Sequence, residues 1–198
     1  MNSQEVLGIF SGRTVSIKYL CSMMHRIFTL LIIMVIISSF TIPNGILKKA
    51  DKVITAFYET EDFQKETILI SKELDAKTPS KFAEGNLFKI MSKGVFLGYG
   101  YIGNAPSKTA TFDYLVLFDK NFIITKSKVL VYREEYGGEI GSRRWLQQFE
   151  GVTLGSKELK YNQDIIPISG ATISVRSMTK AMNDLLHSLS LLQQQHRF

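Results

Sequence analysis

Hydrophobic residues are distributed unevenly along the chain, and the longest apolar segment lies near the N-terminus. From 27 to 42 the sequence reads IFTLLIIMVIISSFTI, without a charged residue; Arg26 precedes it and Pro43 follows it. A helix over these residues would span roughly 24 Å, less than the ~30 Å hydrocarbon core of a bilayer. The basic flank, the apolar stretch and the small polar residues Ser38 and Ser39 are typical of a signal peptide or a short membrane anchor. We assign residues 27–43 to such a segment.

The residues before the apolar segment have the character of neither a signal sequence nor a domain. A start at Met23 or Met24 would place His25 and Arg26 directly before the apolar stretch, as in an ordinary signal sequence. We therefore interpret residues 1–26 as an N-terminal extension whose start is assigned too early. The main domain is expected outside the cytoplasm, on the periplasmic side, either exported or anchored to the cytoplasmic membrane.

Beyond the apolar segment, the pattern first predicts a helix and then an irregular region. Residues 45–58 carry apolar side chains at Ile46, Val53, Ile54 and Phe57, at spacings that place them on one helical face. Residues 59–80 are polar and irregular apart from the apolar run 68–70. We treat residues 44–84 as a helix and an irregular lead-in to the main domain.

The middle of the chain is rich in β-branched and aromatic residues, which favour strands. Strands are predicted over 87–91, 94–102, 109–118 and 122–132. The polar tripeptide 119–121 separates the last two, so we predict a hairpin there. Gly98, Gly100 and Gly103 lie inside the second of these segments and indicate bends or close backbone approach.

Two helices are predicted in the last third of the chain. The first covers 142–149 and ends at Gly151, and the second covers 172–192. In the second helix, an apolar stripe steps by 4, 3, 4 and 3 residues and is expected in the core: Met178, Met182, Leu185, Leu189 and Leu192. His187 lies off that stripe and is expected on the surface. The predicted fold is α+β, an antiparallel sheet flanked by helices.

Composition and charge exclude several classes of function. Lys and Arg number 24 against 18 Asp and Glu, a net charge of +6, but the basic residues are scattered. No basic stripe for phosphate contacts is visible, so no nucleic-acid partner is expected. Cys21 is the one cysteine, which excludes an intramolecular disulfide and any cysteine-based metal site. No His, Asp and Ser constellation points to a catalytic residue, and no metal ligands are predicted.

A glycine-rich loop joins the last strand to the first of these helices. Gly137, Gly138 and Gly141 fall within five residues of one another. Such a loop lets the backbone approach a flat ligand closely. The same pattern also fits a connecting loop that needs positive φ angles, and the residues alone leave both interpretations open.

A second segment, residues 168–174, leads into the C-terminal helix. Ser169 is predicted as its N-cap, while Gly170 and Ala171 leave the helix start unshielded by side chains. Free backbone N–H groups and the helix dipole would favour a phosphate there, beside the hydroxyl of Thr172 in the first turn. A capped helix without a ligand fits the same residues.

Together the two segments resemble a known family. The sequence Ser-Gly-Ala-Thr-Ile-Ser at 169–174, followed by a helix, resembles the flavinylation motif of the FMN-binding domain family. This family includes flavoprotein components of the sodium-translocating NADH:quinone reductase and of the Rnf electron-transport complex. In the family the last Thr of the motif carries FMN through a phosphoester bond, and Thr172 holds that position here. The glycine-rich segment from Glu135 to Gly141 matches the family's upstream loop, so residues 85–198 are assigned as the FMN-binding domain.

The resemblance implies a set of cofactor-binding residues and partners. The phosphate seat would involve Ser169, Gly170, Ala171, Ile173 and Ser174, with the covalent bond at Thr172. The loop near the flavin ring would involve Gly137, Gly138, Glu139, Ile140 and Gly141, with Trp145 and Tyr132 as candidate stacking partners. A separate FAD-dependent flavin transferase would attach the FMN, and electrons would pass from a membrane donor to an unknown acceptor. The family usually has an acidic residue six positions before the modified Thr, where this chain has Ile166, and Asp164 lies two residues earlier.

Two alternatives to an electron-relaying flavoprotein follow from the same residues. The first is a flavin-dependent reductase of a small extracytoplasmic acceptor, although the chain offers no recognisable substrate site. The second is a cofactor-free interaction domain on a membrane anchor, in which Ser-Gly-Ala-Thr serves only to begin a helix.

Overall fold

The computed structural model describes residue 24, residues 42–82 and residues 85–195. The predicted N-terminal extension and nearly all of the predicted signal or anchor segment fall outside these residues and stay predictions. Within the part of the chain that is described, no helix has both the length and the apolar character that a membrane crossing requires.

A five-stranded antiparallel sheet forms the centre of the described chain, with its strands in chain order. The strands are β1 (Gln64–Thr67), β2 (Leu87–Ser92), β3 (Val95–Pro106), β4 (Thr111–Phe118) and β5 (Ile124–Val131). The four predicted strands are therefore confirmed, and β4 and β5 form the predicted hairpin around residues 119–121. Each strand pairs with its neighbour in the chain, as in a meander.

Each face of the sheet packs against a hydrophobic core. Successive side chains of a strand point to opposite faces, so one strand contributes to both cores. In β4 the side chains divide between two hydrophobic cores: Phe112, Tyr114, Val116 and Phe118 belong to one, and Leu115 and Leu117 to the other. This explains why β4 is apolar along most of its length. A sheet flanked by helices, as the sequence predicts, is confirmed.

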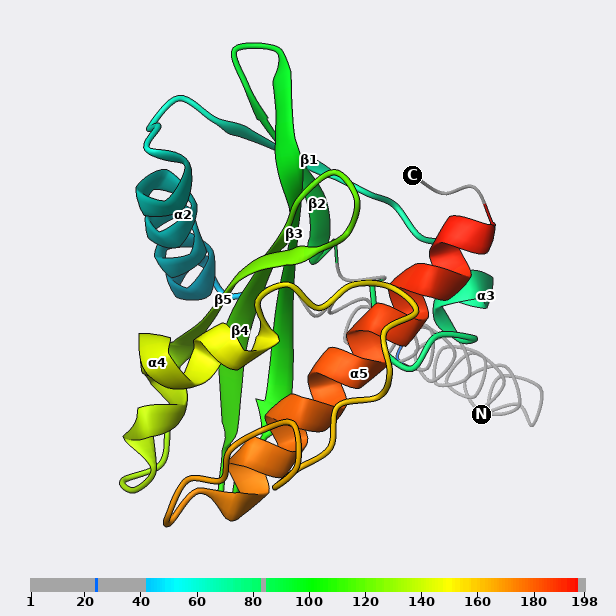
Figure 1. Ribbon diagram of the computed structural model, residues 1–198. Helices are drawn as coiled ribbons and strands as arrows, with labels where there is room; N and C mark the ends of the chain where they lie inside the picture. Colours follow the sequence, from blue (N-terminus) through cyan, green and yellow to red (C-terminus); the bar gives the residue numbers. More distant parts are fainter. Residues whose placement is uncertain (1–23, 25–41, 83–84, 196–198) are drawn as a thin grey trace, which may run out of the picture. The chain divides into compact units, whose positions relative to one another are not determined.

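Helix α2 (Asn44–Tyr58) covers one face of the sheet, as Figure 1 shows. Its buried residues Ile46, Ala50 and Ile54 are four positions apart and share a core with Ile90 and other residues of β2, β3 and β4. Phe57, which the sequence places on the same face, has 37% of its surface exposed. The helical stripe that meets the sheet thus runs through Ala50 and does not reach Phe57.

Helix α5 (Thr172–Gln194) covers the opposite face (Figure 1). The predicted stripe is confirmed, because Met178, Met182, Leu185, Leu189 and Leu192 are all fully buried. His187 is exposed, as predicted. The burial of this stripe fixes the rotation of α5 about its axis, and with it the position of the residues in the first helical turn.

Two short elements fall in the region predicted to be irregular, which corrects that prediction. The polar strand β1 pairs with β2 through its backbone at the edge of the sheet, and α3 (Lys72–Asp75) follows Ser71. An edge strand gains its hydrogen bonds from the neighbouring strand and does not need an apolar face, so its sequence carries no alternation.

Three short helical elements connect β5 to the rest of the chain: η1 (Gly138–Gly141), α4 (Arg143–Leu146) and η2 (Gln147–Phe149). The predicted helix over 142–149 is confirmed, with a 3₁₀ turn as its second half. The Ser142 hydroxyl caps α4 by accepting a hydrogen bond from the Trp145 backbone N–H. The glycine-rich loop itself folds into the 3₁₀ turn η1, which the sequence did not predict.

Candidate functional site

The segment before α5 makes a tight turn. The Ala171 N–H donates to the carbonyl oxygen of Ile168 at 3.1 Å, and Gly170 takes a left-handed conformation with φ of 75°. The helix then begins at Thr172, with Ala171 as the N-cap residue and no side-chain capping hydrogen bond. The prediction that Ser169 is the N-cap is therefore wrong, because the turn places Ser169 two residues before that position.

The start of α5 keeps free hydrogen-bond donors. The first N–H groups of any α-helix have no partner within the helix. Among the described residues, the first N–H in α5 that finds an acceptor is that of Val175, which donates to Ala171 at 2.9 Å. The N–H groups of Thr172, Ile173 and Ser174 consequently direct their partial positive charges into the space before the helix. Thr172 lies in this first turn, as predicted, and it is exposed.

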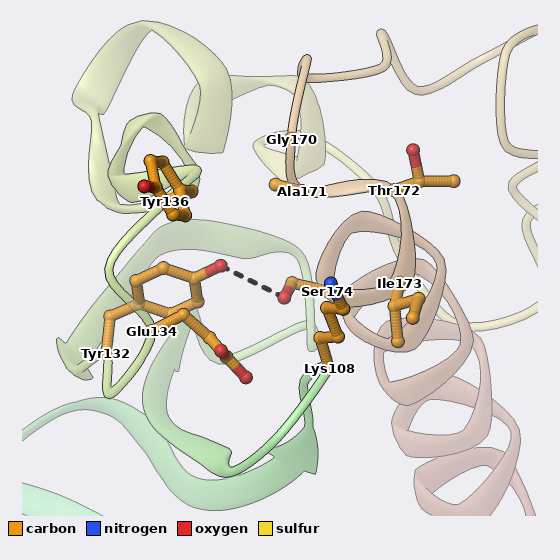
Figure 2. A pocket seen from close by; sticks show the side chains of 9 residues that line it. All are labelled: Lys108, Tyr132, Glu134, Tyr136, Gly170, Ala171, Thr172, Ile173 and Ser174. Carbon is orange, nitrogen blue, oxygen red and sulfur yellow. Dashed lines mark hydrogen bonds between the residues drawn. The ribbon is translucent and has the colours of Figure 1, made fainter.

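A hollow of about 340 Å³ opens beside this helix start, as Figure 2 shows. Three parts of the chain line it: the turn between β3 and β4, the segment after β5, and the first turn of α5. The lining residues are Lys108, Tyr132, Glu134, Tyr136, Gly170, Ala171, Thr172, Ile173 and Ser174. Five of the six residues from 169 to 174 that the sequence assigns to the phosphate seat, all but Ser169, are thus gathered at one hollow.

The wall of the hollow is fixed by a hydrogen bond between two elements. The hydroxyl groups of Tyr132 and Ser174 lie 3.1 Å apart and form a hydrogen bond (Figure 2). Ser174 is buried, with 2% of its surface exposed. The bond ties the segment after β5 to the first turn of α5, so the two sides of the hollow are held in register.

The glycine-rich loop packs against the motif at Gly137. Gly137 is in the left-handed region, with φ of 77°. A Cβ added there would overlap the Cβ of Ala171 and lie 3.1 Å from its Cα. The two segments that the sequence singled out, about 30 residues apart in the chain, are therefore in direct contact.

The other residues of the glycine-rich loop lie away from the hollow. Gly138 and Glu139 are exposed, and Ile140 is fully buried in the core. Glu139 lines a different hollow of about 730 Å³, together with Ser169. An added Cβ at Gly138 would meet no atom within 4 Å, and one at Gly141 would meet only Val129, so neither glycine packs against the motif as Gly137 does.

Trp145 also lies apart from the hollow beside Thr172. Its indole is buried, packs edge-to-face on Phe149, and donates its N–H to the carbonyl oxygen of Ile166 at 2.8 Å. It lines the 730 Å³ hollow and not the one that Thr172 lines. The structure thus gives Trp145 the role of holding the chain before the motif.

Comparison with known families bears on this arrangement. Residues 109–187 match the family model of the FMN-binding domain. This part of the chain is an FMN-binding domain. The match identifies the family and no particular member of it, and no curated protein matches the chain. The matched range covers β4, β5, the glycine-rich loop and the first 16 residues of α5. Both segments that carry the resemblance therefore lie inside it.

The residues at the hollow of the FMN-binding domain fit a phosphate-bearing cofactor. The free N–H groups of the first turn of α5 suit an anion, and the Thr172 hydroxyl stands beside them. Gly170 leaves the approach open, since an added Cβ would meet no atom closer than 3.7 Å. Tyr136 and Ile173, which are 75% and 49% exposed, offer apolar surface at the rim.

Three residues of this hollow were missed by the sequence reasoning: Lys108, Glu134 and Tyr136. The Glu134 carboxylate accepts hydrogen bonds from the Thr109 backbone N–H at 2.7 Å, from its hydroxyl at 2.8 Å, and from the Ala110 N–H at 3.1 Å. The Ser107 side chain and the Thr109 backbone and side chain stabilise the charged form and lower the pKa of Glu134 to about 2. Lys108 had no signal in the sequence, because only the sheet brings the turn between β3 and β4 to the hollow.

The acidic position of the family motif differs in this FMN-binding domain. Ile166 stands there and is 67% exposed. The nearby Asp164 accepts hydrogen bonds from the Lys157 ammonium at 2.6 Å and the Lys160 backbone N–H at 3.0 Å. These bonds lower the pKa of Asp164. Asp164 is thus engaged within its own loop, and it lines neither the hollow at Thr172 nor the one beside Trp145.

Proposed function

We propose that this protein is an exported or membrane-tethered carrier of FMN, attached covalently through a phosphoester on Thr172, which relays electrons between a membrane donor and another redox partner. One observation carries the proposal: the exposed hydroxyl of Thr172 stands in the first turn of α5, beside unpaired N–H groups and at the edge of a hollow. The family match to an FMN-binding domain supports the identity of the cofactor.

The residues of the hollow divide the task of holding the cofactor. The N–H groups of Thr172, Ile173 and Ser174 would receive the phosphate. The side chains of Tyr136 and Ile173 would contact the flavin ring, since an aromatic ring and an aliphatic chain both pack well on a flat π-system. FMN, when bound, supplies the transfer of one or two electrons, while the protein sets its position and its potential.

Covalent attachment suits a protein that works outside the cytoplasm. A tether makes occupancy independent of the local concentration of free cofactor, so an exported domain keeps its flavin. The bond would be formed by a separate FAD-dependent flavin transferase before the protein meets its redox partners. An exposed Thr172 in an exposed turn is a site that another enzyme can reach.

Denaturing electrophoresis with detection of flavin fluorescence tests this proposal. The full chain is produced in cells that contain a flavin transferase, and the unfolded protein band is expected to fluoresce. Thr172→Ala should abolish that fluorescence, and Thr172→Ser should keep part of it. Thr67→Ala, at an exposed position in the edge strand β1, is the matched control and should fluoresce like the wild type.

Three outcomes would contradict the proposal. Fluorescence that persists on the Thr172→Ala band would exclude this residue as the attachment site. A colourless wild-type protein would favour the cofactor-free interaction domain, and turnover of a small acceptor by the isolated flavoprotein would favour the reductase.

A further inference from the structure

The turn between β3 and β4 brings a lysine to the hollow. Lys108 lies within residues 107–110, where the Ser107 N–H donates to the carbonyl oxygen of Ala110 at 2.9 Å. Its side chain lines the hollow together with Thr172, and in Figure 2 it extends toward Ser174. A group attached to Thr172 and lying along this hollow would therefore extend toward Lys108.

Two charged side chains line the hollow, and they differ in how they are engaged. The Glu134 carboxylate accepts three hydrogen bonds from the turn that carries Lys108. The Lys108 ammonium, in contrast, forms no ion pair and no hydrogen bond with any residue that the structure describes. The negative charge is thus committed to holding the turn, while the positive charge is available to a ligand.

We infer that Lys108 raises the reduction potential of the flavin by stabilising its reduced, negatively charged form, with Glu134 acting as a positioning residue that holds the Lys108 turn. This inference rests on the proposed function. The relevant step is the uptake of two electrons from the redox donor and one proton from water, which leaves the flavin ring with one additional negative charge. A cation beside the ring lowers the free energy of that product and leaves the neutral oxidised ring little affected.

The phosphate would have binding partners other than Lys108. The N–H groups of the first turn of α5 lie beside Thr172 and would stabilise the negative charge of the phosphate there. Lys108 lines the same hollow from the turn between β3 and β4. The cation therefore lines the space that a cofactor attached to Thr172 would enter, and it would act on the charge that such a cofactor gains on reduction.

The midpoint potential of the covalently bound flavin tests this inference. Lys108→Met is expected to shift the potential to a more negative value, and Lys108→Arg to keep it close to that of the wild type. Lys120→Met is the matched control, since Lys120 is exposed in the turn at the other end of β4, roughly 25 Å away. It should leave the potential unchanged.

The outcomes separate this inference from the proposed function. Fluorescence of the denatured band first establishes that each variant carries flavin. Equal potentials in the wild type, Lys108→Met and Lys120→Met would overturn the role of Lys108 and leave the proposed function intact. A wild-type protein without covalent flavin would overturn both.

Discussion

Gly137 packs directly on Ala171, so closely that a single methyl group at Gly137 would overlap the Ala171 side chain. The first residue belongs to the glycine-rich loop after β5, and the second is the N-cap residue of α5. This contact positions the turn that presents Thr172. It also explains why the loop needs glycine here, since Gly137 combines a left-handed φ with a neighbour in van der Waals contact.

Gly137→Ala is expected to lower the free energy of unfolding by about 1–3 kcal/mol, because the substitution adds both backbone strain and a clash with Ala171. Displacement of Ala171 should also reduce the yield of covalent flavin. Urea unfolding and fluorescence of the denatured band measure the two effects. Gly138→Ala is the control, since an added Cβ there meets no atom within 4 Å. Equal stability of the two variants would contradict the close contact.

Ser169→Ala is expected to change the free energy of unfolding by less than about 0.5 kcal/mol, because Ser169 does not cap α5. Removal of a true N-cap hydroxyl typically costs about 1 kcal/mol. Ser142→Ala provides that comparison, since the Ser142 hydroxyl accepts a hydrogen bond from the Trp145 N–H. Urea unfolding of both variants checks the assignment. A larger loss for Ser169→Ala than for Ser142→Ala would show that Ser169 caps the helix after all.

Tyr132→Phe should lower the free energy of unfolding by about 1–2 kcal/mol, because it leaves the buried Ser174 hydroxyl without its partner. Ser174→Ala removes the other half of the pair and should cost less than Tyr132→Phe. In the double variant the two losses should not add, and a double-mutant cycle should give a coupling of about 0.5–1.5 kcal/mol. Strict additivity would argue against this hydrogen bond.

The folded protein should lose stability in acid partly through Glu134. Its pKa is about 2 in the folded state, below the ordinary glutamate value of 4.5, so the charged form stabilises the fold at neutral pH. This contribution is present above pH ~4.5 and is lost as the pH falls toward 2. Melting temperatures measured across this range should fall more steeply for the wild type than for Glu134→Gln. Glu135→Gln, at the exposed neighbouring position, should keep the wild-type slope.

Several parts of the fold could be predicted from sequence because each depends on local pattern. The apolar residues from Met178 to Leu192 repeat at helical spacing, which predicts a helix with one face on an apolar surface. That face is fully buried. The polar tripeptide between β4 and β5 marks a hairpin for similar reasons. The edge strand β1 could not be found in this way, because its pairing with β2 runs through the backbone and leaves no trace in the side chains.

In the candidate site, too, local features could be predicted from the sequence, and features that depend on tertiary contacts could not. The motif from Ser169 to Ser174 is contiguous, so its resemblance to a flavinylation motif and the place of Thr172 in the first helical turn could be predicted from its residues and from the helix that follows. The role of Ser169 could not, since it depends on the turn closed between Ile168 and Ala171. Nor could the burial of Trp145, which depends on its packing with Phe149 and its bond to Ile166.

The sequence by itself determined that this chain has an antiparallel sheet covered by helices, and that the Thr172 hydroxyl of the motif lies in the first turn of the last helix. Those properties follow from the periods of 2 and 3.6 residues and from short-range steric rules. Only the tertiary structure decided which distant side chains share the hollow with Thr172. Lys108 comes from the turn between β3 and β4, and Tyr136 from the loop after β5. Their proximity depends on the register of β3, β4 and β5 and on the rotation of α5, which are set by packing over the whole domain.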